Sequence, residues 1–335
     1  MKRLLITMGD ACGIGPEIAV AAWAADAQRG QLCLVGEVGV LRRALALRGL
    51  VLPVARLDAP DEALPPGCLP VWQPDGLPAE LAALPPGRID ARAGRAAALC
   101  IEAAVAAIQA DQAAGLVTAP IHKEALHAAG VEYPGHTEML QALAAAPGMA
   151  PPPVRMMLAN EELRTVLVTI HVSLRQAIEQ LSTERVLQTI RISDAALKRF
   201  GIAAPRLAVA GLNPHAGEGG LFGRDEIEII EPAVRQAQAE GIVASGPYAP
   251  DTVFMRARNT AEHPGEFDLV VAMTHDHGLI PVKYLGVEEG VNVTLGLPFV
   301  RTSPDHGTAF DIAGRGRADP SSMAAAIRMA RRLLG

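Results

Sequence analysis

A short apolar run, Asp268–Met273 (DLVVAM), leads directly into the polar sequence Thr274-His275-Asp276-His277-Gly278. Branched apolar residues in a run of this length are typical of a buried parallel strand, which helices cover on both faces. Polar residues that follow such a strand lie in the crevice beyond the carboxyl edge of the sheet, where α/β proteins bind their ligands. This feature therefore predicts an α/β fold with a site at the strand ends.

The same arrangement occurs twice more along the chain. His171 follows a predicted strand over 164–170, and His215 follows one over 206–210. If the three strands are parallel neighbours, His171, His215 and His275 converge on one edge, and three neutral imidazoles describe a catalytic site for a divalent ion. Such a set suits zinc, cobalt or nickel better than calcium. A single histidine at a strand end is more often structural, and the sequence does not show that the strands are neighbours, so both interpretations stay open.

Two carboxylates stand near these histidines in the sequence. Asp276 follows His275 directly, and Asp251 lies between the second and third histidine. Carboxylates beside a metal site either orient the imidazoles or move protons in the reaction. We therefore count Asp251 and Asp276 as candidate catalytic residues.

Other residues indicate an anionic ligand. Lys283, Asn292 and Arg301 lie in glycine- and valine-rich sequence with few charges. A cation there either faces solvent, as most do, or meets an anion such as a phosphate or a carboxylate. His136 and Thr137 stand at the start of a predicted helix, where they either cap the helix or bind an anion at its N-terminus.

The rest of the chain alternates predicted strands and helices, as expected of an α/β protein. Predicted strands cover 3–8, 31–35, 51–56 and 115–118, and 9–17 is a glycine-containing turn that is either a tight βα connection or a weak phosphate loop. Prolines recur between Leu57 and Gly87 and favour loops and edge strands there. A hairpin is predicted over residues 154–159 and 164–170. Its exposed edges need covering by a partner chain or by another element of this chain.

Composition sets further limits. A chain of 335 residues is long enough for two domains, and a net charge of -6 argues against a nucleic-acid binder. No apolar run approaches the roughly 20 residues of a membrane-spanning helix, and Gly9-Asp10 ends the first apolar run too early for a signal peptide. We expect a cytoplasmic protein whose four scattered cysteines stay reduced.

Six motifs, taken in order, resemble the 4-hydroxythreonine-4-phosphate dehydrogenase (PdxA) family from end to end. They are GDACGIGPEI, VTAPIHKEAL, GHTEML, GLNPHAGEGGLFG, MTHDHGLIPVKYLG and GVNVTLGLPFVRTSPDHGTAFDIAGRG. The resemblance implies two α/β domains of the isocitrate and isopropylmalate dehydrogenase kind, with the active site in the cleft between them. It implies a cofactor-side domain of residues 1–130 plus 294–335, a metal, substrate and dimerisation domain of residues 131–293, and a homodimer in which the partner completes each site.

The resemblance also implies residue roles. Divalent metal ligands would be His171, His215 and His275, with zinc, cobalt or magnesium as the ion. Substrate contacts would be His136, Thr137, Lys283, Asn292 and Arg301. Catalytic residues would be Asp276, Lys283 and Asp251. The loop His306–Gly316 is similar to the adenosine-binding loop of isopropylmalate dehydrogenases, so His306, Gly307, Asp311 and Gly314 would hold NAD. A carboxylate at Asp311 would repel the 2′-phosphate of NADP.

The implied reaction is oxidation of 4-phosphooxy-L-threonine by NAD, with loss of carbon dioxide, to give 3-amino-2-oxopropyl phosphate. Two positions depart from the family pattern: Ala11-Cys12 stands where many members have Pro-Ala, and His277 stands where Gln is common. Relatives that act on D-threonate or D-erythronate 4-phosphate, or on cis-dihydrodiols of aromatic acids, are therefore alternatives. A ligand-binding or metal-sensing protein on the same scaffold is a further alternative, which NADH formation would exclude.

Overall fold

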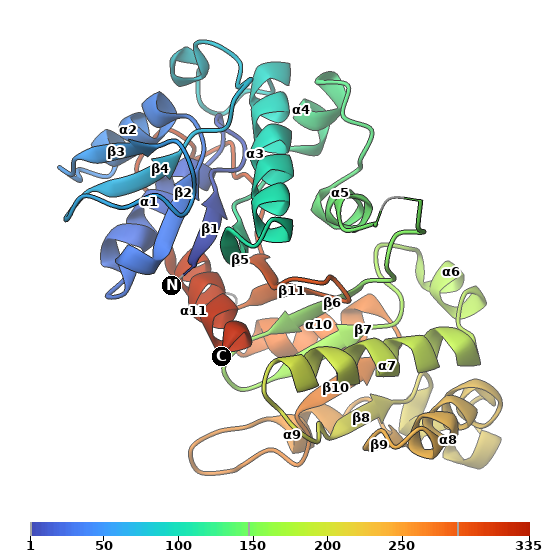
Figure 1. The fold of residues 1–335 in the computed structure, drawn as a ribbon. Coiled ribbons are helices and arrows are strands. Elements are labelled where there is room, and N and C mark those ends of the chain that lie inside the picture. Colours follow the sequence, from blue (N-terminus) through green and yellow to red (C-terminus); the bar gives the residue numbers. More distant parts are fainter. Residues whose placement is uncertain (1, 147, 287) are drawn as a thin grey trace. The chain divides into compact units, whose positions relative to one another are not determined.

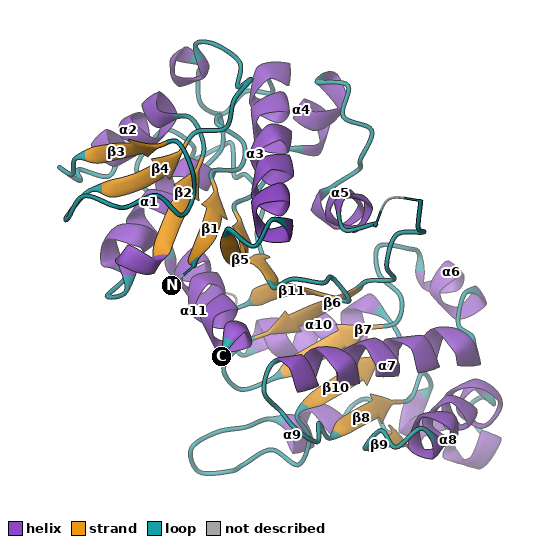
Figure 2. Cartoon of the chain, viewed as in Figure 1, coloured by secondary structure: helices purple, strands orange, loops and turns teal. Residues whose placement is uncertain are grey.

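The computed structural model describes residues 2–146, 148–286 and 288–335. The chain forms two compact units, one of residues up to Pro153 together with Leu297–Leu334, the other of Val154–Gly296. In each unit helices flank a β-sheet (Figures 1 and 2), so the predicted α/β fold is confirmed. In the described ranges no helix is both long and apolar enough to cross a membrane.

The sheet of the first unit is parallel throughout, with strand order β3-β4-β2-β1-β5-β12. Its strands are β1 (Arg3–Thr7), β2 (Leu32–Val35), β3 (Val54–Leu57), β4 (Leu69–Trp72), β5 (Ala113–Thr118) and β12 (Arg301–Pro304). Its helices are α1 (Gly15–Ala25), α2 (Val38–Leu47), α3 (Ala91–Gln109), α4 (Lys123–Ala128), α5 (His136–Leu143) and α11 (Ser321–Leu334). The central strands are buried on both faces, as their unbroken apolar sequences require.

Local sequence explains where two of these helices begin. Pro16 occupies the first turn of α1, where no amide donor is needed. Asp90 caps α3 by accepting a hydrogen bond of 2.8 Å from the amide of Arg92. Within α3, a side chain at Gly94 would meet the carbonyl oxygen of Ala125 at 2.1 Å, so glycine permits α3 and α4 to pack closely.

Two expectations for this unit differ from the structure. The proline-rich segment holds β4, which is an interior strand between β3 and β2 rather than an edge strand. The sheet tolerates Pro70 because pairing with β2 begins only at Val71. Residues 131–153 belong to the first unit rather than to the second, because α5 packs against α3.

The sheet of the second unit has the order β11-β6-β7-β10-β8-β9. Its strands are β6 (Arg155–Ala159), β7 (Arg164–Leu167), β8 (Leu207–Ala210), β9 (Ala244–Tyr248), β10 (Leu269–Ala272) and β11 (Val291–Leu295). Its helices are α6 (Leu174–Glu179), α7 (Thr183–Arg199), α8 (Glu231–Ala239), α9 (Val253–Ala257) and α10 (His275–Tyr284). Strands β7, β10, β8 and β9 are parallel, and β6 is antiparallel to both β7 and β11.

The hairpin predicted over 154–170 is confirmed as β6 and β7. Its edges need no partner chain, because β11 covers the outer edge of β6 and β10 covers that of β7. Another element, which the sequence also allowed, therefore covers each hairpin edge, so the hairpin gives no support for a dimer. The expectation of a dimer then depends on the family resemblance alone.

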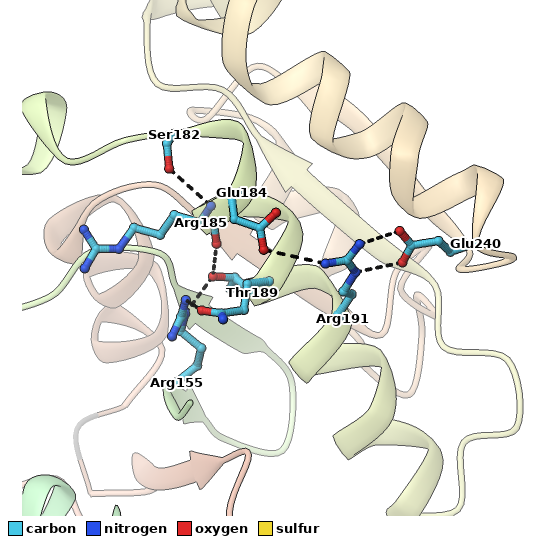
Figure 3. A network of polar contacts seen from close by, with 8 residues as sticks. Arg155, Ser182, Glu184, Arg185, Thr189, Arg191 and Glu240 are labelled. Atoms are coloured by element: carbon cyan, nitrogen blue, oxygen red, sulfur yellow. Dashed lines mark hydrogen bonds and ion pairs between the residues drawn. The ribbon is translucent and has the colours of Figure 1, made fainter. Parts of the chain in front are cut away.

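Helix α7 is fixed to its surroundings by a polar network (Figure 3). Ser182 caps its first turn, and Thr189 accepts a hydrogen bond of 2.8 Å from Nε of Arg155 in β6. Arg191 donates two hydrogen bonds to the carboxylate of Glu240, just after α8. These contacts tie α7 to the sheet and to α8, and so make a rigid support for the loops at the strand ends.

Candidate active site

The carboxyl ends of β7, β10 and β8 form one edge of the second unit, since these strands are parallel neighbours in that order. His171, His275 and His215 follow them, which confirms the strand arrangement expected from the sequence. A cavity of about 310 Å³ is lined by His171, His275 and His277. A second, of about 600 Å³, is lined by His215, Asp251 and His277. Asp276 lines both cavities.

The three candidate ligands are not equally close. The ring centroids of His171 and His275 lie 5.7 Å apart, whereas the ring of His215 lies beside Phe222, with centroids 6.0 Å apart. Across the described ranges, no three His, Cys, Asp or Glu side chains are gathered closely enough to hold a metal ion. The donor types and their common edge nevertheless suit a divalent ion, and Nδ1 of His275 lies 2.8 Å from Oδ1 of Asp276, which would leave Nε2 free to bind such an ion.

The backbone is strained at two of these histidines. His171 has φ 21° and His215 has φ 51°, in the region that favours glycine. Such strain costs about 1–3 kcal/mol per residue and persists where the surroundings enforce it, often at functional sites. It is consistent with a functional role for both residues.

His277, which departs from the family pattern, lines both cavities. Its Nδ1 is buried and has no hydrogen-bond partner among the described residues. A buried polar atom without a partner is uncommon in native proteins. His277 is therefore added to the candidate site residues on its position between the two cavities.

The remaining second-unit candidates, Lys283 and Asn292, are not among the residues that line the two cavities. Lys283 is exposed and follows His275 by eight residues in α10, which separates them by about 12 Å along the helix. Asn292 is in β11, half-buried, where it pairs with Leu158. The structure thus does not bring Lys283 or Asn292 to the residues that line the two cavities.

In the first unit, Arg301 and His136 form a second candidate group. Arg301 is 3% exposed and donates hydrogen bonds of 3.2 and 2.6 Å to the hydroxyl of Thr118. Burial lowers the pKa of Arg301 to about 10. Burial and the nearby charge of Arg301 hold the pKa of His136 well below its usual value, and Nε2 of His136 is buried with no partner among the described residues. Thr137 follows His136 in the first turn of α5.

The loop with the predicted cofactor residues packs on the first loop of the chain. The amide of Ile14 donates to the carbonyl of Thr308 at 3.0 Å, and the amide of Gly314 donates to Oε1 of Glu17 at 2.7 Å. Gly314 has φ 78°, which favours glycine, whereas Gly307 has open space around it. His306, Gly307 and Asp311 are exposed, and so are accessible to a ligand.

The first turn is the tight βα connection that the sequence allowed. At Gly9, with φ 69°, a side chain would meet the carbonyl oxygen of Pro120 at 2.3 Å. Asp10 is fully buried and accepts a hydrogen bond of 2.8 Å from the amide of Cys12. Burial raises the pKa of Asp10 from 3.8 to about 6. The burial of this acid was not foreseen from the sequence.

Sequence analysis also missed Thr118 and Glu226. Thr118 ends β5 and follows the strand-end pattern, which was applied only to histidines. Glu226 lies in the π-helical turn Glu226–Ile230 and binds the loop before His215 through contacts 13 and 14 residues apart. No local pattern in the sequence signals such contacts.

A family model described as "Pyridoxal phosphate biosynthetic protein PdxA" matches residues 28–330. The chain belongs to the PdxA family. It is 51% identical to a 4-hydroxythreonine-4-phosphate dehydrogenase of Beijerinckia indica, over 98% of this chain and 94% of the relative. It is 45% identical to a D-threonate 4-phosphate dehydrogenase of Pectobacterium atrosepticum, over 99% of each chain.

A solved structure agrees with this assignment. The crystal structure of 4-hydroxythreonine-4-phosphate dehydrogenase from Klebsiella pneumoniae matches with a TM-score of 0.90 and 44% identity, covering 99% of this chain and 98% of that one. The resemblance inferred from the six motifs is thus confirmed. Members of the PdxA family with both substrate names lie at similar identity, so family membership alone does not select between those substrates.

Proposed function

We propose that this PdxA family member oxidises 4-phosphooxy-L-threonine with NAD and decarboxylates the product, giving 3-amino-2-oxopropyl phosphate for pyridoxal phosphate synthesis. The reaction moves a hydride from the carbinol carbon to NAD and the hydroxyl proton to a base. The bond to the carboxylate then breaks, carbon dioxide leaves, and the carbon that keeps the electron pair takes up a proton.

One observation supports the proposal that the substrate is phosphorylated. Arg301 is buried and positively charged, and the neighbouring His136 has a buried ring nitrogen with no partner among the described residues. A buried ring nitrogen without a partner is uncommon, and guanidinium binds phosphate with paired hydrogen bonds. Thr137, in the first turn of α5, adds a hydroxyl at a helix N-terminus. We assign the phosphate to these three residues.

His171, His215 and His275 would hold one divalent ion, with zinc, cobalt or magnesium as the candidates. Such an ion, when bound, polarises the alcohol and later the ketone. Asp276 orients the imidazole of His275, and Asp251, which lines the cavity of His215, is the candidate to take the hydroxyl proton. Lys283 and Asn292 are kept as candidate catalytic and substrate contacts on the resemblance alone.

NAD is assigned to the loop around His306, Gly307, Asp311 and Gly314. The support from the structure is that this loop is held on the first loop of the chain while the side chains of His306 and Asp311 stay exposed. The exposed carboxylate of Asp311 would accept hydrogen bonds from a ribose diol and repel a 2′-phosphate. NAD is therefore proposed over NADP.

D-Threonate 4-phosphate is the second candidate substrate, because a relative with that name is 45% identical. The two substrates share the phosphate, the carboxylate and the secondary alcohol, and they differ in an amino or hydroxyl group. NADH formation should therefore be measured with a panel of phosphorylated four-carbon acids, with and without a chelator. Turnover of only unphosphorylated diols, or none with any compound, would reject the proposal.

We further propose a homodimer that completes each site, on the family resemblance. A His171→Ala variant and a Lys283→Ala variant, each inactive alone, should regain activity when mixed if the two residues act from opposite subunits. Full activity of a monomer in sedimentation at assay concentration would contradict a shared site.

A further inference from the structure

The loop that carries His215 is held in an unusual backbone conformation. Five consecutive residues, from His215 to Gly219, have φ values of 51°, 51°, 79°, 43° and 63°. Three of them, His215, Ala216 and Glu218, are not glycine. Left-handed helical conformation costs roughly 1–2 kcal/mol for each such residue, so the surrounding structure must enforce it.

The carboxylate of Glu226 accepts hydrogen bonds from the start of this loop. Its Oε1 accepts hydrogen bonds from the amides of Leu212 at 2.8 Å and Asn213 at 2.7 Å, and its Oε2 accepts one from Nδ2 of Asn213 at 3.0 Å. Glu226 is only 2% exposed. Within the described chain no Lys, Arg or His forms an ion pair with it, so its charge is balanced by amide donors of this loop.

The carboxylate also fits against the turn itself. A side chain at Gly217 would meet Oε2 of Glu226 at 2.6 Å, and one at Gly211 would meet Oε1 at 3.0 Å. Glu226 begins a π-helical turn, Glu226–Ile230, a rare form that is frequently found at functional sites. One buried side chain therefore contacts both the residues before the turn and Gly217 within it.

We propose that Glu226 is a positioning residue, which holds the left-handed turn so that the imidazole of His215 can bind the divalent ion. Burying a carboxylate without a cation beside it costs folding free energy, which a loop with no function would not require. Its contacts lie on the strained backbone that leads to the candidate ligand. This inference rests on the proposed metal site at His171, His215 and His275.

The test is the affinity of the purified full-length protein for Co²⁺ alone, measured by calorimetry and by the visible absorbance of the bound ion. In Glu226→Gln, the side-chain oxygen can still accept hydrogen bonds from the backbone amides of Leu212 and Asn213. The new side-chain NH₂ group, however, would face Nδ2 of Asn213, and two donors cannot form a hydrogen bond. We expect about tenfold weaker binding, as for other groups that orient metal ligands. Glu226→Ala should weaken binding further. Glu228→Gln is the matched control, because Glu228 is exposed and pairs only with Arg224 in the same segment.

The outcomes separate the two proposals. Circular dichroism first establishes that each variant is folded, and Glu226→Gln decides the question if Glu226→Ala does not fold. Wild-type affinity in folded Glu226→Gln would overturn the role of Glu226 while leaving the metal site intact. Two results would refute the metal site and this inference together. One is that the wild-type protein binds no Co²⁺, and the other is that His215→Ala binds Co²⁺ with the wild-type affinity.

Discussion

Nδ1 of His275 lies 2.8 Å from Oδ1 of Asp276, although the two residues are consecutive in the first turn of α10. The carboxylate is 79% exposed, so the contact adds little to stability. Its effect is on orientation, because it fixes which ring nitrogen of His275 is free to face the cavity shared with His171. This relationship sets the geometry on which the metal proposal depends.

The first prediction concerns the metal ligands. His215→Ala should abolish turnover and remove most bound metal, because two imidazoles are too few for a stable site. Metal content by emission spectroscopy and NADH formation are the measurements. His263→Ala, which alters an exposed histidine, is the control and should keep both. Full metal content in His215→Ala would exclude this ligand.

The second prediction concerns the phosphate. Arg301→Met removes the buried guanidinium while keeping an unbranched side chain, and should weaken substrate binding by about 2–5 kcal/mol. The substrate concentration for half-maximal NADH formation is the measurement. Arg328→Met, on α11, is the control. An unchanged half-saturation value would place the phosphate elsewhere.

The third prediction concerns cofactor choice. Asp311→Asn should narrow the preference for NAD over NADP by about tenfold or more, since the repulsion of a 2′-phosphate is lost. The ratio of kcat/KM for the two cofactors measures this, and the effect should shrink with added salt. Equal use of both cofactors by the wild-type protein would refute the assignment of Asp311.

The fourth prediction concerns Asp10, whose pKa is raised by burial from 3.8 to about 6. The folded chain therefore binds this proton more tightly than the unfolded chain does, so stability from Asp10 is greatest at low pH and is lost as pH rises through about 6. The difference corresponds to about 3 kcal/mol. Asp10→Asn should raise the free energy of unfolding by about 1–3 kcal/mol near neutral pH and leave it unchanged below about pH 4. A gain of equal size at both pH values would disprove the titration of Asp10.

Much of this fold follows from sequence patterns that act over a few residues. Apolar runs such as the one ending at Met273 are long enough for buried strands, and each delivers a polar residue at its end. The hairpin of β6 and β7 is also local, since Asn160 accepts hydrogen bonds from the amides of Glu162 and Leu163 in the turn. Such features depend on neighbours in sequence, so a single chain predicts them.

The parts that could not be predicted depend on contacts between distant segments. β4 became an interior strand because β2 and β3 pair on either side of it, which its prolines did not suggest. The lowered pKa of His136 reflects its burial and then the charge of Arg301, which lies far along the chain. Lys283 and Asn292 are not among the residues that line the cavities, which depends on how α10 and β11 pack and follows from no spacing rule.

The left-handed turn at His215–Gly219 has a consequence for anyone who sets out to make this protein more heat-resistant. Glycine at position 216 or 218 would relieve strain there, so selection for thermal tolerance should favour it. Each such change would also free the backbone that carries His215. Glycine at either position should therefore increase thermal stability and lower the catalytic rate. Variant libraries that are screened for thermal stability alone should accumulate stable variants with low activity.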